Sequence, residues 1–323
     1  MTMNSIEEIA GQLLKEQEWL LIGHSIPDGD CVGSLLGMAG GLASLGKEVR
    51  ILLQDPIPHI YNYLQGMEML VSLDQVKLGA GGILFLDCAD RQRVGDSVDQ
   101  WLGEQKLPTV NIDHHLGNNL FADYNYVDHT AAAAGEIVLQ VLKALNVTIT
   151  PPIAEALFAA LIMDTGSFLN TNTTSRTLRF AAELMDNGVS LDRTRINLFE
   201  SKTRKEILLT QRALRHLDFS DDGRIAWMLL PYQDLIEIGA LDLHPEGLIN
   251  YTRMIQGVEV GVLLREVKPG LIKIGLRSRG QVDVASLAAK FGGGGHRAAA
   301  GARLEGTLEE VRERVINKIK EVI

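Results

Sequence analysis

The chain has 323 residues, of which 46% are hydrophobic and 22% are charged, so it can bury the cores of about two domains. Its formal net charge of −10 excludes a protein that grips long nucleic acid over a broad basic surface. The sequence contains two cysteines, an acidic N-terminal segment and no apolar run of membrane-spanning length. We therefore expect a cytoplasmic protein without a disulfide framework.

Helical and strand patterns alternate over the first half of the chain. Short apolar runs typical of buried strands lie at 19–23, 49–53, 83–86 and 109–112. Helical patterns lie at 6–16, 32–45, 94–102, 131–145, 151–163 and 175–187. This alternation predicts an α/β fold in which a parallel sheet carries helices on both faces.

The pattern changes after a charged stretch at 192–216. Strand patterns at 225–230, 258–267 and 271–277 precede helical patterns at 284–291 and 308–322. They predict a smaller α+β domain with a mostly antiparallel sheet. We therefore expect domains at 1–189 and 213–323, joined by a helical linker at 190–212.

Acidic and histidine residues follow three of the predicted strands. The first strand is followed by His24, Asp28 and Asp30, the third by Asp87, and the fourth by Asp113, His114 and His115. Because ligands bind at the carboxyl ends of parallel strands, we expect these side chains to meet in one crevice. A single one of them is explained more simply as a helix cap or a satisfied polar group. Together, however, the carboxylates would repel one another without a cation between them.

Asp164, at the end of an apolar helical run, is a further candidate ligand. Imidazoles and carboxylates without thiolate suit Mn²⁺ or a related divalent ion and disfavour structural zinc. This number of ligands favours two ions, about 3.5–4 Å apart, which activate water and neutralise phosphate charge. The expected substrate is therefore a phosphate ester or anhydride.

Four segments resemble, in chain order, the motifs of the DHH phosphoesterases. They are Gly23-His-Ser-Ile-Pro-Asp-Gly-Asp30, Phe85-Leu-Asp87, Asn111-Ile-Asp-His-His115 and Leu161-Ile-Met-Asp164. The segment 283–301, with glycines at 292–295, resembles the signature of the DHH-associated C-terminal domain. The resemblance covers nearly the whole chain. It implies a metal-binding catalytic domain at 1–189 and a substrate-binding domain at 213–323.

The resemblance also implies the roles of individual residues. The first metal would be held by His24, Asp28 and Asp87, and the second by Asp30, Asp87, His114 and Asp164. Asp87 would then bridge the two ions. Asp113 would orient His114 or join the metal site, and His115 would face the substrate phosphate as a hydrogen-bond donor or acid.

In the second domain the resemblance implies substrate-binding residues: Arg277, Ser278, Gly293, Gly294, Gly295 and His296. Glycine amides can approach an anion closely because no side chain intervenes, although a flexible turn is the simpler reading of a glycine run. One departure lies after Phe168, where the family often carries a basic residue and this chain reads Leu-Asn-Thr-Asn.

The activity implied by the resemblance is Mn²⁺-dependent degradation of short single-stranded RNA or dinucleotides to mononucleotides, together with dephosphorylation of a nucleoside 3′,5′-bisphosphate, 3′-phosphoadenosine 5′-phosphate. A linear or cyclic dinucleotide phosphodiesterase stays open. The glycine-rich signature disfavours an inorganic pyrophosphatase, and the complete set of ligand types disfavours a non-catalytic nucleotide sensor. The sequence does not decide between a monomer and a homodimer.

Overall fold

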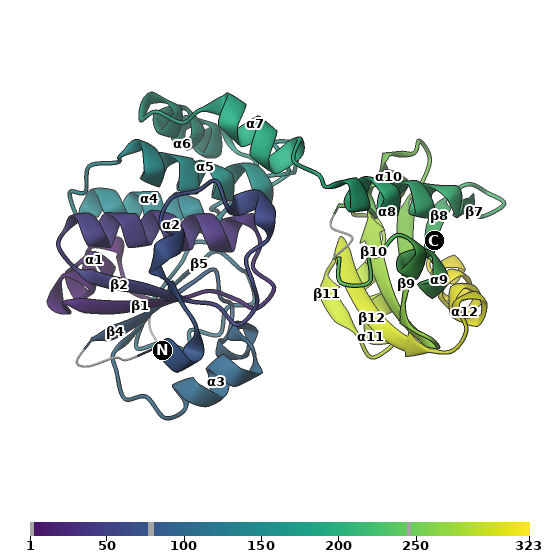
Figure 1. The fold of residues 1–323 in the computed structure, drawn as a ribbon, viewed down its shortest axis with the longest axis horizontal. Coiled ribbons are helices and arrows are strands. Elements are labelled where there is room, and N and C mark those ends of the chain that lie inside the picture. Colours follow the sequence, from purple (N-terminus) through teal and green to yellow (C-terminus); the bar gives the residue numbers. More distant parts are fainter. Residues whose placement is uncertain (1–2, 77–80, 244–246) are drawn as a thin grey trace. The chain divides into compact units, whose positions relative to one another are not determined.

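The computed structural model describes residues 3–76, 81–243 and 247–323. The chain divides into two compact units, Met1–Ser201 and Lys202–Ile323 (Figure 1). This boundary lies inside the expected linker at 190–212: helix α7 (Leu191–Phe199) belongs to the first unit and α8 (Arg204–Arg215) to the second. The domain limits stay a prediction.

A six-stranded parallel sheet forms the centre of the first unit, in the order β3-β2-β1-β4-β5-β6. Its strands are β1 (Glu18–Ile22), β2 (Glu48–Leu52), β3 (Leu70–Val71), β4 (Gly82–Leu86), β5 (Thr109–Asp113) and β6 (Tyr124–Val127). The sequence patterns missed β3, which has only two residues, and β6, which carries a polar Asn125 between its two tyrosines.

Helices cover both faces of this sheet (Figure 1). The helices of this unit before α7 are α1 (Ile6–Lys15), α2 (Gly29–Ser44), α3 (Asp96–Leu102), α4 (Ala134–Ala144), α5 (Pro151–Asp164) and α6 (Ser175–Asp186), with 3-10 turns at His59–Tyr61, Met67–Met69, Leu73–Gln75 and Arg91–Val94. Helix α6 packs on α5. Trp19 and Leu21 belong to the core that also contains side chains of α1, α2, α4 and α5, whereas Leu20 and Ile22 belong to the core on the side of α3. Successive side chains of a strand face opposite sides, so the continuous apolar run of β1 is buried on both faces of the sheet. The predicted α/β fold is confirmed.

Helices α2 and α5 pack closely because α2 is rich in small residues. A Cβ atom added at Gly33 would lie 2.3 Å from the carbonyl oxygen of Ala156 and 2.8 Å from the amide nitrogen of Ala160. Only glycine permits this approach. The contact matters for the site because Asp30 lies in the first turn of α2 and Asp164 ends α5.

The second unit is a mixed sheet in the order β11-β12-β10-β9-β8-β7, in which only β8 and β9 are parallel. Its strands are β7 (Leu217–Phe219), β8 (Ile225–Leu230), β9 (Val260–Lys268), β10 (Leu271–Ser278), β11 (Gly294–His296) and β12 (Ala299–Glu305), and its helices after α8 are α9 (Tyr232–Glu237), α10 (Asn250–Met254), α11 (Val284–Ala289) and α12 (Leu308–Lys320). The expected α+β fold is confirmed. The sequence patterns did not predict β12, because its first residues, Ala-Ala-Gly-Ala, have low strand propensity. This segment forms a strand through its pairing with β10.

Within the described residues, every helix is too short or too polar to cross a lipid bilayer.

Candidate metal centre

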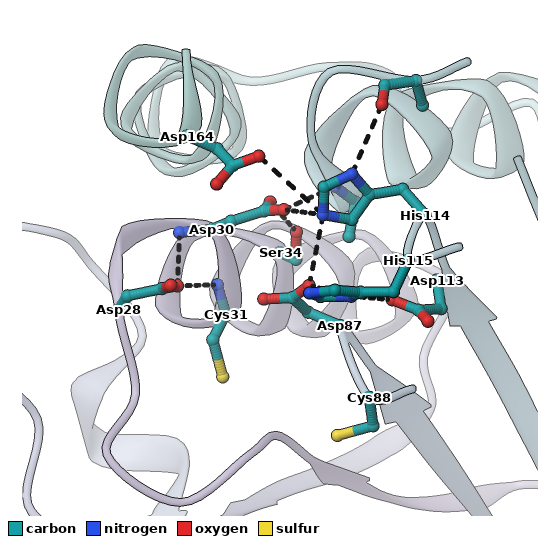
Figure 2. A network of polar contacts seen from close by, with 12 residues as sticks. Asp28, Asp30, Cys31, Ser34, Asp87, Cys88, Asp113, His114, His115 and Asp164 are labelled. Carbon is teal, nitrogen blue, oxygen red and sulfur yellow. Dashed lines mark hydrogen bonds and ion pairs between the residues drawn. The ribbon is translucent and has the colours of Figure 1, made fainter. Parts of the chain in front are cut away.

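The acidic and histidine side chains singled out in the first unit meet at the carboxyl ends of β1, β4 and β5 (Figure 2). They come from the loop after β1, the first turn of α2, the residues after β4 and β5, and the last turn of α5. The side chains form three groups, and in each group the donor atoms lie within 4.8 Å of one another. The groups are His24 with Asp28 and Asp87; Asp30 with His114 and Asp164; and Asp87 with His114 and His115. The structure therefore brings together all the predicted metal ligands.

Asp87 lies at the centre of the cluster, directly after β4, at φ 60°. Its Oδ2 is 3.4 Å from Nε2 of His24, and its Oδ1 is 3.5 Å from Nε2 of His114. This Oδ1 is buried and makes no hydrogen bond within the described part of the chain. Burial alone would raise the pKa of Asp87, but contacts with His114 and His24 lower it well below its usual value. Buried polar atoms normally have a partner. A bound cation would supply the partner that this ionised oxygen lacks.

His24 presents one ring nitrogen to this centre. Its Nδ1 lies 2.8 Å from the carbonyl oxygen of Ser25, while Nε2 lies 3.6 Å from Oδ1 of Asp28. A backbone carbonyl on one nitrogen leaves the other as the ligand. Burial would lower the pKa of His24, but Asp28 and Asp87 outweigh it and raise the pKa to about 10. Oδ1 of Asp28 also caps α2 by accepting hydrogen bonds from two amides of its first turn.

His114 faces the second group of carboxylates (Figure 2). Its Nε2 lies 3.5 Å from Oδ2 of Asp30 and 3.8 Å from Oδ2 of Asp164, and its Nδ1 lies 3.3 Å from the carbonyl oxygen of Ala131. Burial would lower the pKa of His114, but Asp87 and Asp30 raise it to about 10. Burial and the charge of Asp87 raise the pKa of Asp164 to about 6 against the attraction of His114.

Asp30 is oriented by a helix that begins more than 100 residues later. Its two oxygens accept hydrogen bonds from the amides of Ala134, at 2.6 Å, and Gly135, at 3.0 Å, and Oδ1 also accepts one from Ser34. The N-cap residue of α4, Ala133, has no side-chain cap of its own. The Asp30 carboxylate therefore caps α4 at its positive end. The helical pattern at 131–145 concealed this contact, because α4 starts at Ala134 and Ala133 is extended.

Asp113 contacts His115 and Asn118. Its Oδ1 lies 2.8 Å from Nδ1 of His115, and its Oδ2 accepts a hydrogen bond of 2.7 Å from Asn118. Burial would raise the pKa of Asp113, but His115 and Asn118 lower it. On the other side of the ring, Nε2 of His115 lies 3.4 Å from Nη1 of Arg93. Sequence reasoning did not select Arg93 or Asn118, whose only signal was their position after strand ends.

The donor set fits a divalent cation. The N···O separations around Asp87 and His114, 3.4–3.8 Å, exceed the usual hydrogen-bond range of about 2.7–3.2 Å. They match donors that share one ion, because ligands about 2.1 Å from a metal lie about 3–4 Å apart. Burial and the charge of Asp87 also raise the pKa of Asp30 well above its usual value, so the carboxylates repel one another when no cation is bound.

In the second unit, the predicted substrate residues lie at one end of the sheet. β12 pairs with β10 on one side and with β11 on the other, so Ala299 stands opposite both Arg277 and His296. The backbones of these two residues are therefore two strands, about 9.6 Å, apart. The side chain of His296 lies outside the described part of the structure. Arg277 is half-buried, and its burial and the nearby charge of Arg253 lower its pKa.

The glycine run and Ser278 have structural roles of their own. The amides of Gly292 and Gly293 donate to carbonyls at the end of α11, so they serve as its C-terminal cap. Gly294 and Gly295 lie in β11, and a Cβ atom at Gly293 would meet a carbonyl oxygen of β12 at 2.1 Å. Ser278 is buried, and its hydroxyl donates to the carbonyl oxygen of Val282.

Comparisons with known proteins agree with this architecture. The family model described as "DHH family, N-terminal domain" matches residues 18–161, and the "DHHA1 domain" model matches residues 245–323. A Thermus thermophilus protein named bifunctional oligoribonuclease and PAP phosphatase NrnA is 34% identical over 301 residues, which are 92% of this chain and 88% of that protein.

Two solved structures share the fold. An exopolyphosphatase-related protein from Bacteroides fragilis has a TM-score of 0.91 at 24% identity, covering 98% of this chain and 96% of that protein. RecJ from Thermus thermophilus in complex with Mn²⁺ has a TM-score of 0.55 at 14% identity, covering 99% of this chain and 55% of RecJ.

Proposed function

Because the chain belongs to the DHH family and is a metal-dependent phosphoesterase, we propose that it degrades short oligoribonucleotides to mononucleotides and also dephosphorylates 3′-phosphoadenosine 5′-phosphate. The observation that carries this proposal is the convergence of His24, His114 and the carboxylates of Asp28, Asp30 and Asp164 around Asp87, whose buried Oδ1 makes no hydrogen bond within the described part of the chain. The Thermus relative, 34% identical over most of both chains, is named for the same pair of activities.

Two divalent ions, Mn²⁺ in our proposal, would be held in this centre. The first would lie among His24, Asp28 and Asp87, and the second among Asp30, Asp87, His114 and Asp164. When bound, such ions lower the pKa of water and neutralise charge that develops on a phosphoryl group. Support for manganese comes from the mixed nitrogen and oxygen donors.

His115 and Arg93 are proposed to bind the reacting phosphate. Asp113 holds Nδ1 of His115, so the ring has a set orientation. Nε2 and the Arg93 guanidinium lie next to each other. The guanidinium can donate hydrogen bonds to phosphate oxygens, and Nε2 can do so when it carries a proton. In this proposal His115 and Asp113 act as a pair, in which Asp113 orients His115 rather than His114.

The second unit is proposed to hold the nucleotide through Arg277, Gly294, Gly295 and His296. The Ser278 hydroxyl and the Gly293 amide, which the sequence also suggested, donate to carbonyl oxygens of the chain, so we propose that they shape this region. Charge distribution supports this assignment, because the second unit contains 19 Lys and Arg against 16 Asp and Glu, whereas the first contains 12 against 25. A small surplus of positive charge suits a short anionic ligand. We also propose a cytoplasmic protein, which is consistent with two free cysteines, Cys31 and Cys88.

The test is release of mononucleotide from a 5′-phosphorylated RNA dinucleotide by metal-stripped protein to which Mn²⁺ is returned. We expect Mn²⁺-dependent release, and no cleavage of pyrophosphate in a parallel reaction. Cleavage of pyrophosphate alone would contradict the assignment of the second unit. If neither substrate is cleaved while nucleotide still binds, the protein is a sensor and the proposal is wrong.

A further inference from the structure

The segment between α5 and α6, where the chain reads Leu169-Asn-Thr-Asn172, lies against the second ligand group. The Asn172 Nδ2 atom donates a hydrogen bond of 3.0 Å to the carbonyl oxygen of Ala132 and another of 3.2 Å to that of Asp164. The two acceptors are 32 residues apart in sequence. One side-chain amide thus ties the end of α5, which carries Asp164, to the loop that precedes α4.

That loop holds the other two members of the group. Its Ala131 carbonyl oxygen lies 3.3 Å from Nδ1 of His114, and the Ala134 and Gly135 amides at its end bind Asp30. A shift of this loop would therefore change the orientation of His114 and Asp30 together. Asn172 links it to the third ligand, Asp164.

Arg176, in the first turn of α6, fixes the same loop at its two ends. Its Nη2 lies 3.0 Å from Oδ2 of Asp128, and its Nε donates a hydrogen bond of 3.0 Å to Oε2 of Glu136. Glu136 is completely buried in the first turn of α4. Asp128 in turn accepts hydrogen bonds from the amide and hydroxyl of Thr130. A single guanidinium therefore connects the beginning of the loop with the helix that Asp30 caps.

We propose that Asn172 and Arg176 are positioning residues that hold Asp30, His114 and Asp164 in the arrangement needed to bind a divalent cation. This inference rests on the proposed function, because it assigns the second ion to these three ligands together with Asp87. Neither residue belongs to the groups of donor atoms that could hold the ion: each would act through backbone or through another side chain. Partners of this kind typically change metal affinity or activity by about 10–100-fold.

The first test uses Asn172→Ala, with Asn170→Ala as the matched control. Asn170 donates one long hydrogen bond, of 3.3 Å, to the same Asp164 carbonyl oxygen but is exposed. Metal-free protein is titrated with Mn²⁺, and the free ion is followed by its EPR signal. We expect Asn172→Ala to weaken one class of Mn²⁺ sites about 10–100-fold and leave the other unchanged, while Asn170→Ala binds as wild type does. Equal binding by Asn172→Ala and wild type would overturn the role of Asn172.

The second test separates positioning by Arg176 from its part in stability. Arg176→Ala leaves the buried Glu136 carboxylate without its cation and can unfold the protein. We therefore use Glu136→Gln combined with Arg176→Met, which removes both charges, and check its folding by circular dichroism. We expect a folded protein that binds one class of Mn²⁺ about tenfold more weakly. Wild-type affinity in this variant would overturn the role of Arg176.

If the double variant does not fold, Arg176→Lys gives the same readout, because an ammonium cannot reach in both directions as a guanidinium does. Arg179→Lys, one turn along on the exposed side of α6, is its control. We expect Arg176→Lys to weaken Mn²⁺ binding and Arg179→Lys to leave it unchanged, and equal binding by both would overturn the role of Arg176. Wild-type protein that fails to bind Mn²⁺ would instead overturn the proposed function.

Discussion

Replacement of Gly33 by alanine should destabilise the first unit and weaken its metal centre. Gly33 lies in α2 where this helix contacts α5. The added Cβ would lie 2.3 Å from the carbonyl oxygen of Ala156 and 2.8 Å from the amide nitrogen of Ala160. Both atoms belong to the backbone of α5, so they cannot rotate away as a side chain would.

Two opposing contributions decide the magnitude. Alanine in place of glycine favours a helix by about 1 kcal/mol. To restore ordinary contact, however, the two helices must separate by about 1 Å, and overpacking of this kind costs about 1–3 kcal/mol or more. Because the contact is between backbones, we take the upper part of this range and expect a net loss of about 2 kcal/mol. For a unit of this size, such a loss lowers Tm by about 4–8 °C.

Differential scanning calorimetry of the metal-free protein measures this effect, with Gly11→Ala as the control. Gly11 lies in the middle of α1, and nothing lies within 4 Å of its added Cβ, so this variant should gain up to about 1 kcal/mol. Gly33→Ala should also bind Mn²⁺ more weakly, because α2 and α5 carry Asp30 and Asp164. If Gly33→Ala is as stable as wild type or more stable, as the control is, the close packing of α2 and α5 does not constrain the site as we argue.

Four further predictions concern the site and the groups around it. Asp87→Asn should lower mononucleotide release by about 10³-fold or more, because the central ligand loses its charge; activity near wild type would rule out Asp87 as a shared ligand. Mn²⁺ binding at pH 7.5 should release protons, because a pKa of about 10 keeps His24 and His114 protonated before the ion binds. Calorimetry in buffers of different ionisation enthalpy counts the protons released. Binding without proton release would contradict these pKa values. The same raised pKa values stabilise the metal-free fold fully below about pH 6.5, and this contribution should be lost as the pH rises toward 10, as thermal unfolding across that interval would show. Arg277→Ala should raise KM for a dinucleotide without changing Mn²⁺ affinity, whereas the exposed Arg314→Ala should change neither; a loss of metal binding in Arg277→Ala would argue against a substrate role.

Local patterns were enough to predict much of the fold and the residues that meet at the metal centre. Apolar runs long enough for one buried strand identify the strands, and the aspartate and histidine residues that follow three of them identify the edge at which their ends gather. The parallel arrangement then brings His24, Asp87 and His114 together whatever the details of packing. The helical pattern at 32–45 predicted α2, and the structure adds that glycines of this helix lie against α5.

The contacts that orient these ligands depended on the tertiary structure. Asp30 caps a helix 104 residues further along the chain, Asp113 holds His115, and Asn172 joins two segments that no sequence pattern relates. In the second unit, the amides of Gly292 and Gly293 cap α11, although the glycine run had suggested amides open to an anion. Strand and helix patterns reflect burial of each residue's own neighbourhood, whereas a hydrogen bond between distant segments depends on how those segments pack. The sequence by itself therefore determined which groups reach the site, and the packing of α2, α4, α5 and α6 decided how each group is held there.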